Sequence, residues 1–339
     1  MKLLFLVNVI IIIIITITIT TNINYIIIII IINMNHIIII ALTLTLVTLS
    51  VSQPVIYPVV LTLSIPTETP NTERVDNALF RWLTAGGVDL ISIHTWTPSS
   101  EIDTLLQNAT AVVFMGNPSQ PDATSPYYTQ AKYIYDTTKH STHIIPVLAL
   151  GNDLSMLLSF EEATTNITNI KQHSPNSIVF ESFDDVSKYN ILSELDGADY
   201  VNLVSSDICP NQLEYVISRD EFMKHETLNT MYHLVAFART SNDDVTYVAI
   251  VEGKEHPFYG LSFHPEKINF DKGYQVPVPD SHEAVKMARM IGNSFLFHAR
   301  TTNNNVMSKE MKVSYDWIDP YGAFPQEWYG TYQYFFKNE

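Results

Sequence analysis

The chain has 339 residues, with 35 Asp or Glu against 19 Lys or Arg, and its formal net charge is −16. An acidic surface repels phosphate backbones, which argues against nucleic acid as a partner. The single cysteine, Cys209, excludes an intrachain disulfide. There is no glycine-rich phosphate loop and no His/Cys cluster with metal-ligand spacing. We therefore expect neither a cofactor nor a metal.

Residues 1–52 are almost uncharged and contain long isoleucine runs. Their apolar length is enough to span a membrane, so an uncleaved anchor is one interpretation. We favour a secretory signal peptide, because the segment from Met34 has a short polar start, an apolar centre and a small-residue end. Cleavage would precede Gln53, and Met34 would be the true start, with residues 1–33 an upstream extension. Contact with a membrane is expected only if this segment stays uncleaved.

Two Asn-X-Thr triplets, at Asn108 and Asn166, fit a lumenal route as acceptors of N-linked glycans. Such triplets are common by chance and add little alone. Together with the signal-like segment, they predict a glycoprotein that is extracellular or lies in the lumen of a vacuole or lysosome.

After residue 53, apolar strands alternate with amphipathic helices. Strands are expected at 55–63, 88–96, 111–116 and 143–150, and helices at 71–85, 99–106 and 127–138. Gly86-Gly87 is a typical helix stop. This alternation predicts an α/β three-layer sandwich, in which helices cover both faces of a mostly parallel central sheet.

The second half has a different pattern. Residues 166–229 are rich in Ser, Asn and Asp and have no clear period. Strands at 232–240, 245–253 and 258–265 then follow one another, the first two joined by a turn at 242–244, before a helix at 281–299. The aromatic residues after 301 should pack back on the protein. We thus expect three parts: residues 1–52, an α/β domain over 53–300, and a tail over 301–339 packed on that domain.

Two segments carry a resemblance to a known family: GKEHPFYGLSFHPEK at 253–267 and FMGNPSQPD at 114–122. Both resemble the gamma-glutamyl hydrolases, which have the class I glutamine amidotransferase-like fold, and the resemblance covers about 54–335. In that family the His of an HPE sequence is the general base for a cysteine nucleophile, and the Glu orients it. The resemblance therefore implies His264 as base and Glu266 as its orienting partner. It also implies that Gly116 lies in the loop whose N–H groups bind the oxyanion, although Met115 and Asn117 replace the family's Pro and second Gly.

The cysteine itself is missing. A thiolate must stand on a tight turn at a helix N-terminus, and HIIPVLALGNDLSMLL at 143–158 has this strand–turn–helix pattern. Three registers against the family's small-x-Cys-x-Gly pattern place Gly151, Ala149 or Asp153 at the cysteine position. None of the three carries a thiol or a hydroxyl. Glycine most easily adopts the positive φ of such a turn.

No other residue is a convincing substitute. Cys209 lies in SSDICPNQL, without an elbow pattern, and is interpreted as a structural thiol. Ser155 falls inside the predicted helix. The stretch at 211–218 matches a family segment that contains a second histidine, but has no histidine here.

These residues lead to two hypotheses. The first is a gamma-glutamyl-hydrolase-like lumenal or secreted protein that has lost hydrolysis, a pseudoenzyme whose partner is a small molecule with γ-glutamyl groups. The alternative is an active folate poly-γ-glutamate hydrolase, an omega peptidase releasing glutamate with an unrecognised nucleophile. We favour the first, because removing the nucleophile of a catalytic triad costs about six decades of rate.

Overall fold

The structure is a computed structural model, and it describes residues 12–15, 26–29, 58–116, 122–162, 167–172, 178–180, 188–211, 213–239, 245–270, 278–302, 307–315, 318, 326–328 and 331–338. The chain divides into two units, Met1–Ile56 and Tyr57–Glu339. In the first unit, β1 (Ile12–Ile15) pairs antiparallel with β2 (Ile26–Ile29). The segment interpreted as a signal peptide lies outside the described residues. Among those that are described, every helix is too short or too polar to cross a bilayer.

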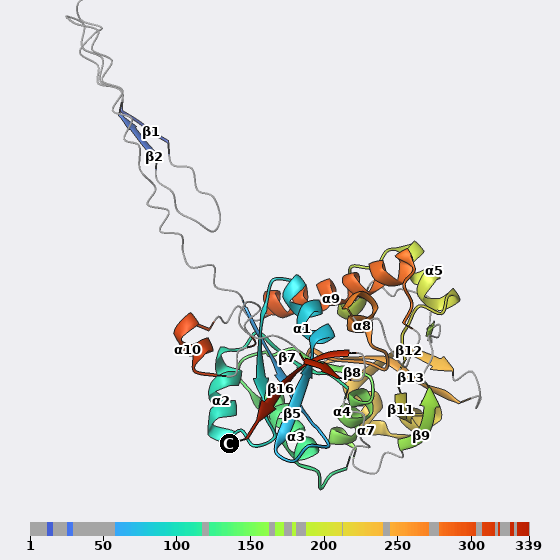
Figure 1. Ribbon diagram of the computed structural model, residues 1–339. Helices are drawn as coiled ribbons and strands as arrows, with labels where there is room; N and C mark the ends of the chain where they lie inside the picture. The colour runs from blue at the N-terminus through green and yellow to red at the C-terminus, as the bar shows by residue number, and fades with distance from the viewer. Residues whose placement is uncertain are drawn as a thin grey trace, which may run out of the picture. The chain divides into compact units, whose positions relative to one another are not determined.

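An eight-stranded sheet forms the centre of the second unit (Figure 1). Its strands are β3 (Val59–Leu63), β6 (Asp89–Ile93), β7 (Ala111–Phe114), β8 (Val147–Leu150), β10 (Ile178–Phe180), β12 (Tyr232–Arg239), β13 (Thr246–Gly253) and β14 (Phe258–Leu261). Their order is β10-β12-β13-β14-β8-β7-β3-β6. The strands from β14 to β6 run parallel, and the pairs on the β10 side are antiparallel. This confirms the predicted α/β fold with a mostly parallel central sheet.

Helices cover both faces of the sheet, which makes three layers. On one side α1 (Asn77–Ala85), α8 (Pro265–Phe270) and α9 (His282–Thr302) contact one another, and on the other α2 (Ser99–Asn108), α3 (Pro126–His140) and α4 (Asp153–Glu161) do so in succession (Figure 1). Every residue of β3, β7 and β8 is therefore buried. Burial on two faces explains why these strands are nearly continuous apolar runs.

The predicted helix at 71–85 is wrong in its first half. Residues Thr72–Asp76 form a strand, β5, and α1 begins only at Asn77. β5 pairs with β4 (Ile65–Pro66) on one side and with β16 (Thr331–Lys337) on the other, and β16 also pairs with β15 (Gln326–Trp328). A partner from the far end of the chain supplies the hydrogen-bond ladder, so tertiary pairing overrides the local helical pattern.

The segment without a predicted period contains short elements. They are β9 (Ile167–Gln172), the 3-10 helix η2 (Asn190–Leu192), α5 (Gly197–Ser205), β11 (Leu213–Ile217), α6 (Arg219–Lys224) and α7 (Glu226–Met231). β11 pairs antiparallel with β9. The strand predicted at 258–265 ends at Leu261, because Pro265 opens α8. The turn predicted at 242–244 lies outside the described residues.

The described part of the tail contacts α1 and β6. Its helix, α10 (Lys309–Val313), places the Lys312 ammonium 2.5 Å from the Asp89 carboxylate. The ring of Tyr334 on β16 meets the ring of Phe80 edge-on, with centroids 5.2 Å apart. The described tail residues therefore contact three separate elements, β5, β6 and α1, instead of packing only on one another.

Candidate functional site

The carboxyl ends of the parallel strands meet at one edge of the sheet. Gly116 comes after β7, Gly151 after β8 and His264 after β14. The chain steps from β3 to β6 in one direction and from β7 to β8 in the other, so the strand order reverses between the neighbours β3 and β7. In open α/β sheets, ligands bind outside the carboxyl ends of the strands at such a reversal. This edge is therefore the candidate site.

Gly151 forms the turn between β8 and α4. Its φ is +55°, in the left-handed region, where a residue with a Cβ pays about 1–2 kcal/mol. A Cβ at this position would lie 2.3 Å from Nε2 of His264 and 2.6 Å from Cε1. Of the three candidates for the cysteine position, Gly151 is therefore the one at which a side chain would point at the imidazole ring of His264.

The other two candidates lie elsewhere. Ala149 is inside the sheet, fully buried, and pairs with Phe114 on β7 and Gly260 on β14. Asp153 is the first residue of α4, and its Oδ2 accepts hydrogen bonds from the N–H of Gly116 and the hydroxyl of Tyr127, each at 2.8 Å. Asp153 is only 2% exposed.

His264 and Glu266 are brought together, as predicted from the sequence. Nδ1 of His264 lies 2.8 Å from Oε1 of Glu266, and both residues are buried. The route differs from the expected extended strand, because Glu266 lies in the first turn of α8. The backbone N–H of His264 donates to the carbonyl of Pro210 at 2.9 Å, which fixes the residue from the other side. With a carboxylate at Nδ1, the neutral imidazole presents Nε2 as an acceptor toward the turn.

The imidazole lies against two glycines at once. Gly116 has φ +91°, and a Cβ there would come within 2.6 Å of Cε1 of His264. Because neither Gly116 nor Gly151 has a side chain, the ring fills the space above both turns. Met115 is buried, and Asn117 lies outside the described residues.

The two alternative nucleophiles are placed as structural groups. Cys209 is fully buried, and burial, with a smaller effect from the charge of Asp207, raises the pKa of its thiol well above the usual value. The hydroxyl of Ser155 donates to the carbonyl of Tyr215 from within α4. A neutral buried thiol and a hydroxyl bound to a carbonyl are poor nucleophiles.

The stretch at 211–218 contributes to the turn without a histidine. It contains β11, and the side-chain oxygen of Asn152 accepts the backbone N–H groups of Glu214 and Tyr215 at 3.0 and 3.2 Å. The residue next to Gly151 is thereby tied to a strand outside the central sheet, which holds the turn in place.

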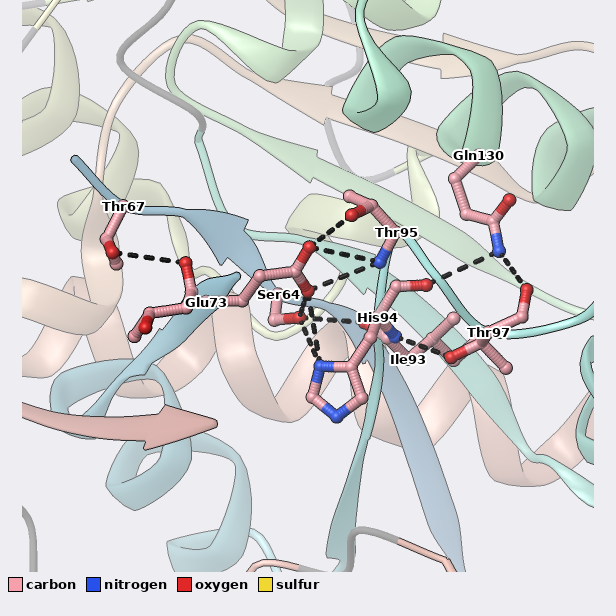
Figure 2. Close-up of polar contacts among 9 residues, drawn as sticks. Ser64, Thr67, Glu73, Ile93, His94, Thr95, Thr97 and Gln130 are labelled. Atoms are coloured by element: carbon pink, nitrogen blue, oxygen red, sulfur yellow. Dashed lines mark hydrogen bonds and ion pairs between the residues drawn. The ribbon is translucent and has the colours of Figure 1, made fainter. Parts of the chain in front are cut away.

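A second polar cluster at the same edge was not predicted from the sequence (Figure 2). Glu73 on β5 accepts from the hydroxyls of Ser64 and Thr95, and from the backbone N–H of Thr95 at 3.2 Å. Nδ1 of His94 lies 3.2 Å from the same carboxylate and 2.8 Å from Oγ of Ser64. Glu73 was expected on a helix, so nothing in the sequence placed it beside residues that follow β3 and β6.

The contacts of this cluster hold parts of the fold together. The hydroxyl of Ser64 donates to Glu73 and also lies 3.0 Å from the carbonyl oxygen of Ile93. The ring of His94 stacks on the ring of Trp96, with centroids 4.7 Å apart, and its centroid lies 4.8 Å from that of Phe336 on β16. The cluster therefore fastens β5 and the C-terminal strand to the sheet edge.

The hydroxyl of Tyr127 is influenced by the charges of both Asp153 and Glu73. Burial first, and then the negative charges of Asp153 and Glu73, raise the pKa of its hydroxyl well above the usual value. The hydroxyl therefore stays protonated and acts as the donor to Asp153.

Of the two predicted glycan acceptors, Asn108 ends α2 with a half-buried side chain, whose Nδ2 donates to the carbonyl of Thr104 at 2.8 Å. Asn166 lies outside the described residues. Within the described part of the chain, no group of three His, Cys, Asp or Glu side chains is arranged to hold a metal ion.

Comparison with known proteins finds curated relatives that are gamma-glutamyl hydrolases. Human gamma-glutamyl hydrolase is 22% identical over 237 residues, which span 68% of this chain and 72% of that protein. Gamma-glutamyl hydrolase 1 of Arabidopsis thaliana is 20% identical over 267 residues, with 75% of each chain covered. This chain is similar to the gamma-glutamyl hydrolases over most of its length. The resemblance inferred from the HPE segment is thereby confirmed.

No family model matches the chain. Among solved structures, a candidate GMP synthase protein from Thermoplasma acidophilum aligns with 72% of this chain and 97% of its own, at 14% identity and a TM-score of 0.47. A glutamine amidotransferase from Methylobacillus flagellatus aligns with 73% of this chain and 96% of its own, at 9% identity and a TM-score of 0.39.

One register of the turn can be compared with the small-x-Cys-x-Gly pattern given above. If Gly151 is taken at the cysteine position, residues 149–153 are Ala-Leu-Gly-Asn-Asp, and Asp153 stands at the last glycine of the pattern.

Proposed function

We propose that this protein is a gamma-glutamyl-hydrolase-like binding protein that does not hydrolyse γ-glutamyl bonds. Its ligand is a small molecule that carries γ-glutamyl groups. One observation carries the proposal: the residue of the turn that faces His264 is Gly151, which has no side chain. A Cβ at this position would lie 2.3 Å from Nε2 of His264.

The chemistry follows from that position. In cysteine-dependent amide hydrolysis, the imidazole takes the thiol proton, the thiolate attacks the amide carbon, and the imidazolium protonates the departing amine. His264 keeps its carboxylate partner, Glu266, but has no thiol to deprotonate. Since loss of a triad nucleophile costs about six decades of rate, hydrolysis should fall below detection.

The active-hydrolase alternative has no residue to support it among those described. Cys209 is a buried thiol with a raised pKa, and Ser155 donates to a carbonyl. Ser64, although 2.8 Å from a histidine nitrogen, has no exposed surface. A substrate carbonyl therefore has no accessible and activated attacking group.

A binding role is supported by the groups that remain. Nε2 of His264, whose Nδ1 lies 2.8 Å from Glu266, faces the turn and can accept a hydrogen bond from the N–H of a γ-glutamyl amide. The site lies at the carboxyl ends of β7, β8 and β14, and β7 borders the strand reversal, where ligands usually bind to an open α/β sheet.

The proposal includes a secretory location, extracellular or in a vacuole or lysosome. It is supported by the signal-like segment before Gln53 and by the sequons at Asn108 and Asn166. The predicted cleavage and the glycan are both measurable on protein secreted from a eukaryotic host.

The test is a hydrolysis assay with pteroyl-poly-γ-glutamate, from acidic to neutral pH, on the wild-type protein and on His264→Ala. We expect no glutamate release by either. Calorimetric titration with the same compound should show binding to the wild type and weaker binding to His264→Ala. Robust cleavage that His264→Ala abolishes would overturn the proposal, and if Cys209→Ala also abolished it, Cys209 would be the nucleophile. Absence of binding would refute the ligand class.

A further inference from the structure

The backbone N–H of Gly116 is already engaged by a side chain of the same site. Oδ2 of Asp153 accepts its hydrogen bond at 2.8 Å. We propose that Asp153 is a built-in blocker of the oxyanion loop, so that this chain has lost two separate parts of the hydrolytic site. This inference rests on the proposed function, and it adds a second determinant to the missing cysteine.

Two hydrogen bonds, a helix N-terminus and burial hold the carboxylate in place. The same Oδ2 accepts the hydroxyl of Tyr127 from α3 at 2.8 Å. Asp153 is also the first residue of α4, where the helix N-terminus favours a negative charge. Because Asp153 is 2% exposed, water does not compete for these bonds.

A negative charge at this place opposes the chemistry that the loop would serve. Amide hydrolysis puts a negative charge on the carbonyl oxygen, which needs N–H donors at about 2.7–3.1 Å. Here the N–H of Gly116 points at a carboxylate, and an oxyanion arriving there would meet a like charge in a buried site. One such donor is worth about 10²–10³ in rate. Restoring a thiol alone should therefore recover little activity.

The position of Asp153 in the sequence supports a specific role. It stands where the gamma-glutamyl hydrolase pattern has glycine, which has no side chain to reach the loop. An aspartate needed only to begin α4 would act through stability alone, and the two roles predict opposite effects on a restored enzyme.

The experiment compares Gly151→Cys, Asp153→Gly and the double variant of the full protein, with pteroyl-poly-γ-glutamate as substrate. The introduced thiolate attacks the γ-amide carbon, a C–S bond forms and the C–N bond breaks, and His264 passes the thiol proton to the departing amine. Water then hydrolyses the thioester. Every variant with the new thiol must move the imidazole aside equally, so this cost cancels when the variants are compared.

We expect kcat/KM of the double variant to exceed that of Gly151→Cys at least about 100-fold, the worth of one donor. Asp153→Gly alone should stay inactive. As a matched control, Tyr127→Phe in the Gly151→Cys background removes the other hydrogen bond to the same oxygen but leaves the carboxylate on Gly116, and should bring no gain. If the double variant does not fold, Gly151→Cys with Asp153→Asn decides, since it removes the charge and keeps the shape; a smaller gain is expected.

Equal rates with and without Asp153, including no cleavage by either protein, would overturn the inference. So would a lower rate in the variant without Asp153, as expected of a purely structural residue. The proposed function fails by a different result, cleavage by the wild-type protein that His264→Ala abolishes. The two failures are therefore distinguishable.

Discussion

Glu73 should be one of the most sensitive positions for stability, and Glu73→Gln tests this with almost no change of shape. The carboxylate is 2% exposed and accepts from Ser64, from Thr95 twice and from His94. The substitution keeps one acceptor oxygen and turns the other into a donor. Every donor that bonded to the negatively charged carboxylate then faces a neutral amide.

The magnitude follows from the difference between charged and neutral acceptors. Hydrogen bonds to charged groups contribute about 1.5–3 kcal/mol, and neutral ones about 0.5–1.5 kcal/mol. A loss of about 1 kcal/mol at each of the three bonds from Thr95 and His94 gives about 3 kcal/mol. The hydroxyl of Ser64 has a second acceptor in the carbonyl of Ile93 at 3.0 Å, so its loss is partly offset.

The assay is urea unfolding of the purified protein, followed by far-ultraviolet circular dichroism. A loss of about 3 kcal/mol shifts the midpoint by about 1–3 M urea, for slopes of about 1–3 kcal/mol per M. Glu255→Gln is the matched control, because Glu255 is exposed and its substitution should stay within about 0.5 kcal/mol. A change of less than about 1 kcal/mol for Glu73→Gln would refute the view that this cluster fastens β5 to the sheet.

Four further predictions are independent of one another. Gly151→Ala should lower the free energy of unfolding by about 1–2 kcal/mol, because φ is +55° and the methyl group meets His264; unchanged stability in urea would contradict the left-handed turn. Deletion of the residues after Thr301 should lower the melting temperature by several degrees, because β16 and its contacts with β5 are lost; an identical calorimetric trace would show that the tail contributes nothing. Cys209 should resist iodoacetamide until the protein unfolds, and rapid labelling of the native protein would contradict its burial. Because burial raises the pKa of the thiol, its contribution to stability is complete below the unfolded pKa of about 9.0 and is lost as the pH rises toward the higher folded pKa. A loss of stability at alkaline pH that Cys209→Ala leaves unchanged would contradict this assignment. Secreted protein should begin near Gln53 and lose mass on enzymatic removal of N-glycans at Asn108 or Asn166; N-terminal sequencing that finds Met1 on a membrane-bound protein would exclude a cleaved signal.

The layered fold could be predicted from local sequence, whereas the candidate site residues were implied by the resemblance of two segments to the gamma-glutamyl hydrolases. Strands such as VVLTL and AVVF are apolar with little interruption, which marks them as buried on both faces wherever their partners come from. The contact between His264 and Glu266 is likewise local, since only one residue separates them. Local pattern is sufficient where burial or close spacing decides the structure.

The features that distinguish this protein depend on contacts between distant segments. The strand at Thr72–Asp76 exists because Thr331–Lys337 pairs with it, more than two hundred residues away, and this pairing brings Glu73 to the sheet edge. The choice of Gly151 among three registers depends on a backbone φ and on where His264 lies after β14 has joined β8. The bond from Gly116 to Asp153 joins the ends of two neighbouring strands. Such contacts depend on which distant segments become neighbours, and no window of local sequence contains that information.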